Sequence, residues 1–342
     1  MIVDEFPDRK IRIEGVEYLY FGGTNYLGMS TNTDFQNLLF ESIKKWGTAY
    51  GSSRNSNIKL SVYSDAEELF AKNCKTEAAL TVSSGMLAGK LIIDHLSRTT
   101  DALFHFPNTH PALWSSSSLP IMENGKLHSK LLDPTISKIS ILADAIPSLE
   151  VKPLDFSILF EIPKEKEVTL VIDESHSIGI SGKNGSGILS TLEIIPIQRK
   201  VCIASLGKAY GLSGGMIAGD RAFIAEIRNQ ASFIGASGMN PAFLETYSKA
   251  QELYQTQLHK LKQNLEYLNK HFSNRESYIF HKDYPVIYFE STHISKKLLD
   301  NKIITTSFKY PTTTGMLNRI VITANHIKDD LDQLLVQLNA IS

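Results

Sequence analysis

Four short apolar segments, separated by helical patterns and polar turns, do most to limit the folds open to this chain. They are residues 78–82 (AALTV), 139–142 (ISIL), 168–172 (VTLVI) and 201–204 (VCIA). Runs that are apolar at nearly every position are typical of strands buried on both faces, and helices between them favour parallel pairing. The first two thirds of the chain is therefore expected to form an α/β domain around a mostly parallel sheet. Such sheets carry their chemistry at the carboxyl ends of the strands.

The pattern changes after about Asn240, where helices and strands become mixed. The expected elements there are a long helix over 241–272, a strand over 286–289, a short helix near 296–299, a strand over 319–323 and a helix over about 328–338. The chain has 342 residues, more than the roughly 250–300 over which a single core grows. We therefore expect an N-terminal segment over 1–45, a large α/β domain over 46–238 and a small α+β domain over 239–342.

Composition excludes several classes of partner. The 35 basic and 36 acidic side chains nearly cancel, which leaves no electrostatic footprint for nucleic acid or anionic lipid. Cys74 and Cys202 lie in apolar surroundings without metal-ligand spacing, so both are expected to be small buried residues and no metal site is expected. No apolar run approaches the roughly 20 residues of a membrane span, and residues 1–12 lack the apolar core of a signal peptide. A cytoplasmic location is expected.

The segment VTLVIDESHSIG, residues 168–179, ends a buried strand in a carboxylate. Asp173 follows the apolar run directly, and His176 comes three residues later. A carboxylate at the carboxyl end of a strand can face a ligand in the crevice of the sheet. Aspartate is also a common helix N-cap, so on this segment alone a purely structural role is about as well supported.

A second segment, VCIASLGKAYGLSGG over 201–215, leads from a strand into a glycine-rich turn that holds Lys208. Glycines allow a backbone to approach a ligand closely, which favours a lysine held in a crowded site over a solvated one. The turn differs from the phosphate-binding loop of nucleotide hydrolases because Ala209, not serine or threonine, follows the lysine.

Two further turns carry weaker signals. Ser84, Gly85 and Met86 lie between a predicted strand and a predicted helix, where exposed amides can bind an anion, although a plain turn is the commoner explanation. His110 follows a short apolar run, and a single loop histidine is usually structural or solvated. Taken together, a lysine, a carboxylate and an anion cradle are what a protein supplies to pyridoxal 5′-phosphate (PLP).

At these residues the chain resembles the α-oxoamine synthases, a branch of the fold-type I PLP enzymes. The similar segments run nearly end to end, and they are NYLG at 25–28, TEAALTVSSG at 76–85, DESHSIGISGKNGSG from 173, SLGKA at 205–209 and PTTTGMLNRIVITANH at 311–326. Each segment alone is moderately specific, whereas their order and spacing make chance matching improbable. The resemblance implies a fold-type I PLP transferase with a large α/β domain, a mostly parallel seven-stranded sheet and a small C-terminal α+β domain.

The resemblance also assigns roles to residues. Lys208 would carry the PLP Schiff base and act as base at the substrate Cα, and Asp173 would pair with the pyridine nitrogen. His176 would hydrogen-bond the ring hydroxyl, and His110 would stack on the ring. The remaining cofactor-binding residues would be Ser84, Gly85, Met86 and Ser205 around the phosphate, and Ser148 near the ring hydroxyl.

On the substrate side, Arg319 would bind the substrate carboxylate, since a guanidinium engages both oxygens. Asn25 and Lys309 are further candidates, with Lys309 standing where the family has a second arginine. The segment YGSSRNSNI at 50–58 departs from the family near its acyl side, where Ile58 replaces a glycine and Tyr63 aligns with a histidine. The resemblance implies a homodimer, in which Ser237 could reach the neighbouring subunit's phosphate.

Three hypotheses follow. The first is an acyltransferase that condenses an amino acid with an acyl thioester, carried by coenzyme A or an acyl carrier protein, and releases carbon dioxide to give an α-amino ketone. Biotin synthesis is the family's commonest association with this chemistry. The second is an aminotransferase or other PLP lyase on the same fold, since fold alone does not decide the chemistry. The third, a former enzyme kept as a scaffold, is disfavoured by the intact Lys208, Asp173, His176 and His110.

Overall fold

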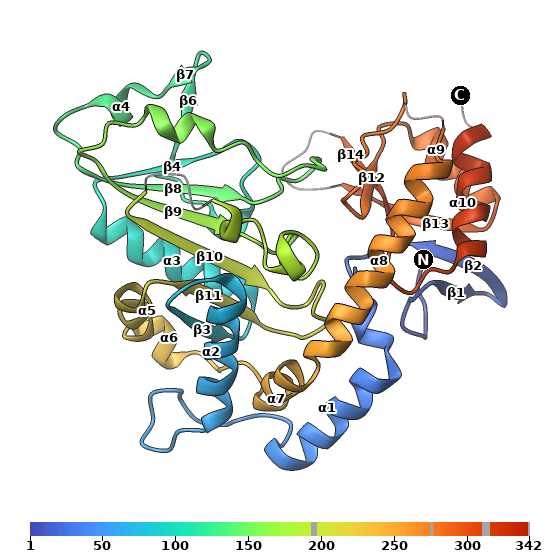
Figure 1. Ribbon diagram of the computed structural model, residues 1–342, viewed down its shortest axis with the longest axis horizontal. Helices are drawn as coiled ribbons and strands as arrows, with labels where there is room; N and C mark the ends of the chain where they lie inside the picture. Colours follow the sequence, from blue (N-terminus) through green and yellow to red (C-terminus); the bar gives the residue numbers. More distant parts are fainter. Residues whose placement is uncertain (193–196, 274–275, 310–314, 341–342) are drawn as a thin grey trace. The chain divides into compact units, whose positions relative to one another are not determined.

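The computed structural model describes residues 1–192, 197–273, 276–309 and 315–340, and it contains two compact units (Figure 1). The large unit comprises residues 34–148 and 153–251. The small unit comprises 1–33, 149–152 and 252–342. The domain boundaries expected after residues 45 and 238 stay a prediction.

A seven-stranded sheet is the centre of the large unit. Its strands, in spatial order, are β3 (Ala78–Val82), β11 (Gly215–Gly219), β10 (Arg199–Ser205), β9 (Glu167–Asp173), β8 (Lys138–Asp144), β4 (Ala102–His105) and β5 (Leu119–Pro120). The pairs from β10 through β5 are parallel, and β11 runs antiparallel to both of its neighbours. The predicted mostly parallel sheet of seven strands is therefore confirmed. All four apolar segments identified in the sequence are strands of this sheet.

Seven helices belong to the described part of the large unit, and some of them cover the two faces of this sheet. They are α1 (Thr33–Trp46), α2 (Ser61–Cys74), α3 (Gly85–Thr99), α4 (Ser129–Leu132), α5 (Arg221–Arg228), α6 (Ala231–Gly235) and α7 (Pro241–Lys249). Side chains alternate between the faces of a strand. On β3, Leu80 and Val82 pack into one core cluster with α3 and α5, whereas Thr81 bonds to Glu67 of α2. Helices α3 and α2 therefore lie on opposite faces.

Short elements complete the large unit. They are the hairpin of β6 (Met122–Glu123) and β7 (Lys126–Leu127), and the 3₁₀ turns η2 (Pro111–Leu113), η3 (Ser157–Glu161), η4 (Lys183–Gly185) and η5 (Leu189–Thr191). The turn η2 begins directly after His110, so it sets the backbone of a predicted site residue.

The small unit contains a five-stranded sheet built from both ends of the chain. Its order is β1 (Lys10–Ile13), β2 (Val16–Phe21), β13 (Ile303–Lys309), β14 (Met316–Val321) and β12 (Val286–Tyr288). Strand β2 pairs in parallel with β13, and the other pairs are antiparallel. Arg9 and Asp330 add an ion pair at 2.7 Å between the two ends. The first 33 residues thus belong to the same compact unit as the C-terminal region.

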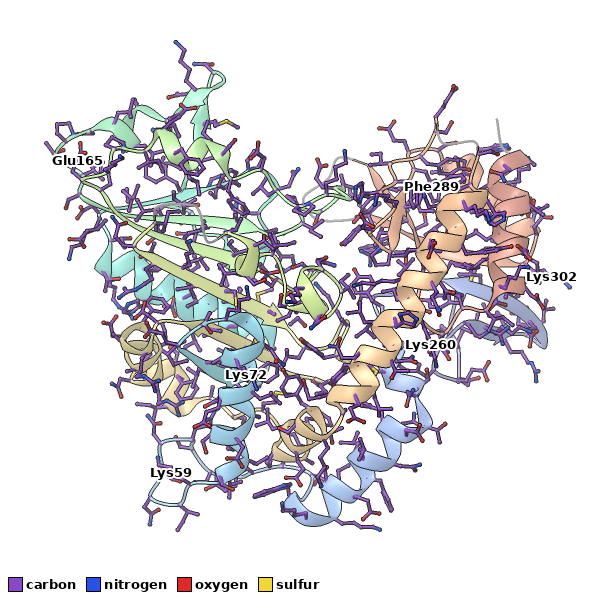
Figure 2. All side chains as sticks on the ribbon, in the orientation of Figure 1. Lys59, Lys72, Glu165, Lys260, Phe289 and Lys302 are labelled. Carbon is purple, nitrogen blue, oxygen red and sulfur yellow. The ribbon has the colours of Figure 1, made fainter. Side chains whose placement is uncertain are left out.

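Three helices pack with this sheet or beside it: α8 (Gln251–His271), α9 (Thr292–Asp300) and α10 (Lys328–Ala340), and a 3₁₀ turn, η1 (Met29–Thr31), follows β2. Helix α8 is amphipathic. Leu258, Leu261 and Leu265 are buried, whereas Lys260, labelled in Figure 2, is exposed.

The helical pattern over 241–272 forms two helices, α7 and α8, that meet at Ala250. At the end of α7, the Thr246 hydroxyl donates to the Ala242 carbonyl and the Ser248 hydroxyl donates to the Leu244 carbonyl. Such bonds to the preceding turn compete with backbone pairing and bend helices. The apolar stripe continues across the break, which is why periodicity predicted one helix.

Candidate active site at the carboxyl ends of the central strands

Three neighbouring strands of the large unit end in polar side chains. Strand β8 ends at Asp144, β9 at Asp173 and β10 at Ser205. Asp144 and Asp173 are register partners, and Asp173 lies opposite Ile203 of β10. Because these strands are parallel, their carboxyl ends meet at one edge of the sheet, the usual place for a ligand in this class of fold.

Lys208 and His176 meet at this edge. Lys208 Nζ lies 2.8 Å from His176 Nε2, within hydrogen-bonding distance. The turn that carries Lys208 is closed by bonds from the Leu212 N–H to the Leu206 carbonyl and from the Leu206 N–H to the Gly214 carbonyl. An ammonium group can only donate, so His176 Nε2 is the acceptor when Lys208 is protonated. The structure therefore brings together two predicted residues that are 32 positions apart.

Asp173 is buried, with 7% of its surface exposed. Its carboxylate accepts the backbone N–H of Ser175 at 2.8 Å. The Ser175 hydroxyl in turn accepts the backbone N–H of Ser205 at 2.8 Å. These bonds join the ends of β9 and β10, so the carboxylate and Ser205 are held by the same short network.

His110 approaches the same cluster from the loop after β4. Its Nδ1 accepts the Ala112 N–H at 3.1 Å and caps the turn η2. Burial lowers the pKa of the His110 ring, the Asp173 carboxylate raises it and the Lys208 ammonium lowers it, with a net decrease. His110 is therefore a neutral imidazole near pH 7, with its proton on Nε2 because Nδ1 is already an acceptor.

The start of α3 lies against the end of β10. Ser84 is the N-cap, and its hydroxyl accepts the Leu87 N–H at 3.1 Å. A Cβ on Gly85 would come within 2.8 Å of the Ser205 Cβ, and one on Gly215 within 2.4 Å of the Ser84 carbonyl group. Only glycine allows these backbones so close. The free amides of Gly85 and Met86 at the start of a 15-residue helix form a site suited to an anion.

The other predicted residues of the large unit lie apart from these contacts. Ser148 is half-buried in the turn after β8, and Ser237 is exposed after α6. Among the described residues, no hydrogen bond joins the side chain of either one to the cluster of Lys208, His176 and Asp173.

Arg319, Asn25 and Lys309 belong to the small unit. The Arg319 Nη2 donates to the Gly23 carbonyl at 3.4 Å, and its buried Nε has no hydrogen-bond partner in the part of the chain that the structure describes. The Asn25 Oδ1 accepts the Ser30 N–H at 3.5 Å. Lys309 is exposed at the end of β13. Residues 311–314 of the motif beside it lie outside the described residues.

The segment that departs from the family has structural partners. Arg54 is buried, donates to Glu67 at 2.8 Å and lies over the ring of Tyr63. The Tyr63 hydroxyl donates to the Met239 carbonyl at 2.6 Å. Ile58 is exposed. This segment is thus tied to the protein core by charged and polar bonds.

Sequence reasoning missed two buried carboxylates. Asp144 lies next to Asp173, and it comes two residues after the predicted strand at 139–142, a weaker form of the signal that Asp173 gives directly after its own strand. Glu174 accepts the N–H groups of Ile188 and Leu189. Burial raises the pKa of Glu174, and these hydrogen bonds act in the opposite direction. Glu174 therefore holds the loop after β9, whereas Asp144 belongs to the candidate site.

Metal-ligand groups and membrane-spanning helices are both absent from residues 1–192, 197–273, 276–309 and 315–340. No three His, Cys, Asp or Glu side chains among them are grouped as metal ligands would be. No helix among them has the length and apolar character to cross a membrane.

The chain matches the family model described as aminotransferase class I and II over residues 152–338. It is 27% identical to 8-amino-7-oxononanoate synthase of Petrotoga mobilis over 97% of this chain and 90% of the relative. It is 25% identical to the enzyme of the same name from Lysinibacillus sphaericus, over 98% and 91%. The similarity to α-oxoamine synthases expected from the motifs is therefore confirmed.

Solved structures show the same fold. Serine palmitoyltransferase of Sphingomonas wittichii superimposes with a TM-score of 0.83 at 17% identity, covering 99% of this chain and 91% of the other. The 8-amino-7-oxononanoate synthase of Francisella tularensis gives 0.71 at 23% identity, covering 94% and 96%. The serine palmitoyltransferase of S. paucimobilis, solved with bound PLP and myriocin, gives 0.81 at 17% identity over 99% and 91%.

These matches confirm three expectations from the sequence: the fold-type I architecture, a PLP-dependent transferase and PLP as its cofactor. The family model alone covers more than half of the 342 residues. The chain belongs to the aminotransferase class I and II family.

Proposed function

We propose that this protein is an acyltransferase of the α-oxoamine synthase type, which joins an amino acid to an acyl thioester. In the overall reaction a carbon–carbon bond forms between the amino acid Cα and the acyl carbon. The thiol leaves, and the amino acid carboxylate leaves as carbon dioxide. The names of the full-length relatives support this reaction type.

The contact between Lys208 and His176 at 2.8 Å, beside Asp173, is the observation that carries the proposal. The residues present fit PLP. Lys208 supplies the amine, Asp173 a buried carboxylate for the pyridine nitrogen, and the amides of Gly85 and Met86 an anion site for the phosphate. The close approach of Gly85 to Ser205 supports the same arrangement. When bound, PLP would supply an electron sink for the negative charge that develops at Cα.

Lys208 is the group proposed to take the Cα proton. A lysine base acts in its neutral form, and His176 Nε2 lies 2.8 Å from the Lys208 amine, within hydrogen-bonding distance. We propose that His110 covers one face of the ring, and that its neutral imidazole, with the proton on Nε2, is suited to donate a hydrogen bond.

Arg319 is proposed to bind the substrate carboxylate, with Asn25 and Lys309 as further substrate-binding residues and Ser148 near the ring hydroxyl. The buried, unpartnered Arg319 Nε supports this role, since a buried guanidinium donor without a partner is costly and a carboxylate would satisfy it. The amino acid and the acyl group are left open, and coenzyme A and an acyl carrier protein are both candidate carriers.

An aminotransferase is the second candidate. The observation that favours it is the altered segment near the acyl side, where Arg54 and Tyr63 are already bonded to Glu67 and Met239. Acyl transfer needs a second substrate site, whereas transamination uses the amino-acid site twice in turn.

We also propose a cytoplasmic homodimer, in which Ser237 of one subunit approaches the phosphate site of the other. Sedimentation of the purified protein would test the dimer.

The test uses purified protein with PLP, single amino acids and then acyl-CoA, followed by visible absorption and by free thiol release. Thiol release that requires both the amino acid and the thioester supports the synthase. Conversion of the cofactor to its amine form by the amino acid alone identifies an aminotransferase and rejects the synthase.

The variant Lys208→Ala is expected to lower the turnover rate by about 10²–10⁴-fold, the usual contribution of a catalytic acid or base. It should also lose the absorption band of lysine-bound PLP. Lys72→Ala is the matched control, because Lys72 is exposed on α2 (Figure 2). Retention of the band and the rate in Lys208→Ala would reject the assignment of Lys208.

A further inference from the structure

Two carboxylates lie side by side at the edge of the central sheet. Asp144 and Asp173 end the adjacent parallel strands β8 and β9 and are register partners, so their side chains emerge on the same face. They are 5% and 7% exposed. Two buried carboxylates at neighbouring positions rarely both carry charge, because burial and mutual repulsion each favour the protonated form.

The neighbours of the two carboxylates differ. Asp173 accepts the Ser175 N–H and lies at the strand next to β10, which leads to Lys208. Asp144 accepts only a backbone donor, the His110 N–H at 3.0 Å, among the bonds that the described residues show. Burial, and then the charge of Asp173, raise the pKa of Asp144 well above its usual value, against the smaller effects of the His110 N–H and the Lys208 ammonium.

The bond to Asp144 fixes one particular point of the loop after β4. The preceding residue, Thr109, has its own anchors, because its hydroxyl contacts the carbonyls of Phe106 and Leu142. His110 depends on Asp144 for its backbone N–H and on the turn η2 for its ring Nδ1. Loss of the Asp144 carboxyl would therefore release the His110 backbone while leaving Thr109 anchored.

We propose that Asp144 is a positioning residue that acts as a neutral acid near pH 7, fixing the backbone of His110 and leaving Asp173 as the single negative charge at this edge of the sheet. The inference rests on the proposed roles of His110 and Asp173 toward PLP. A single negative charge matches the single positive charge of a protonated pyridine nitrogen. Asp144 would thus affect the cofactor in two indirect ways. It would hold His110 in place, and because it is neutral it would add no second negative charge near the pyridine nitrogen.

The experiment measures the PLP dissociation constant of the apoprotein at pH 7 by absorption titration for Asp144→Asn and Asp144→Ala. Asparagine keeps a neutral acceptor for the His110 N–H, so its dissociation constant should stay within about twofold of wild type. Alanine leaves that buried donor unsatisfied, and binding should weaken by roughly tenfold. Asp65→Asn, an exposed aspartate of α2, is the matched control and should change nothing.

A second readout reports on the loop without PLP. Trp114 ends η2 and is 60% exposed, so in a Trp46→Phe background its quenching by iodide reports on the His110 turn alone. Asp144→Ala should increase the quenching, and Asp144→Asn should not. Because quenching needs no PLP, this measurement still tests the inference if Asp144→Ala folds but does not bind PLP.

Two results would overturn the inference. If Asp144→Asn binds PLP as weakly as Asp144→Ala, the carboxylate charge is what matters and the neutral acid is wrong. If both variants match wild type in PLP binding and in quenching, Asp144 positions nothing. Failure of the proposed acyl transfer is a separate outcome, because these measurements require PLP binding and no thioester.

Discussion

Two charged clusters of the large unit, each containing a buried carboxylate, differ in how well their charges are matched. The Arg54 network consists of Arg54, Glu67, Thr81 and Arg228. Glu67 accepts Arg54 at 2.8 Å and Arg228 at 2.9 Å, and it also accepts the Thr81 N–H at 2.7 Å. Both of its oxygens are therefore used, and Arg54 also donates to the Thr81 carbonyl. Every described charge in the network faces a group of opposite sign or a donor.

The sheet-edge cluster, Asp144, Asp173, His110, His176 and Lys208, is arranged differently. Its two carboxylates are neighbours, and burial with the charge of Asp173 raises the pKa of Asp144. Lys208 Nζ lies 2.8 Å from the ring of His176, a group that is neutral or positive and never negative. Satisfied networks are typical of structural roles, whereas shifted, incompletely matched groups gather at functional sites.

The largest effect is expected on breaking the Arg54 network. Glu67→Ala leaves the buried Arg54 without its counter-ion, and loss of one partner of a buried pair costs about 3–5 kcal/mol of unfolding free energy. Chemical denaturation would measure it, with Glu68→Ala as control because the neighbouring Glu68 is exposed and should change stability by no more than about 0.5 kcal/mol. Equal effects of the two variants would show that the network is not structural.

An intermediate effect, of opposite sign, is expected for Asp144→Asn in the apoprotein. The pKa of Asp144 is raised on folding, so the stability that this group gives is complete below the usual aspartate pKa of about 3.9 and is lost as pH rises through the folded value. Asparagine does not ionise, so the variant does not lose stability in this way as the pH rises. At pH 8 the variant should be more stable than wild type, by about 1.4 kcal/mol for every unit by which folding raises the pKa of Asp144.

Denaturation of both proteins at pH 5 and pH 8 would measure this difference. The stability advantage of Asp144→Asn should be smaller at pH 5, because pH 5 lies only a little above the usual aspartate pKa of about 3.9 and less of the wild-type loss has accumulated there than at pH 8. An advantage that grows at the lower pH would mean that Asp144 is charged in the folded protein, and the contrast between the two clusters would then be lost.

The smallest effect is expected for Ser84→Gly, because Ser84 lies beside the sheet-edge cluster but has an ordinary structural bond. Its hydroxyl accepts the Leu87 N–H as N-cap of α3. Ser84→Ala should cost about 1 kcal/mol of unfolding free energy and Ser84→Gly only a few tenths, both measured by thermal unfolding. A larger loss of PLP affinity than of stability would instead assign the hydroxyl to the phosphate site.

The strands and the polar residues that end them could be predicted from the sequence. Residues 78–82 form β3 with the expected bounds, and the three other apolar runs lie within β8, β9 and β10. The strands β4, β5 and β11 of this sheet were not predicted. The glycines of β11, Gly215 and Gly219, weaken a strand signal, yet Gly215 is required by the close approach of the Ser84 carbonyl. The requirement for glycine at position 215 therefore comes from a contact between segments that are far apart in the chain.

The candidate site divides in the same way. Lys208 and Asp173 are candidates because each lies in a local pattern, a glycine-rich turn or a strand end, and the family resemblance added the role of His176. Asp144 has a similar pattern, but its meaning comes from the register that sets it opposite Asp173. Register is fixed by pairing between strands, and no local periodicity encodes it.

The sequence by itself therefore predicted an α/β domain from apolar periodicity and, together with the family resemblance, PLP as the cofactor and Lys208 as the candidate residue that binds it, because strand patterns, turn composition and motifs are properties of neighbouring residues. Tertiary structure alone decided that the first 33 residues complete the C-terminal sheet through β2 and β13, that Gly85 lies against Ser205, and that two carboxylates share one edge. These depend on contacts between segments far apart in the chain. Burial and the repulsion between these two carboxylates then favour the protonated form of one of them, an effect that an isolated aspartate would not show.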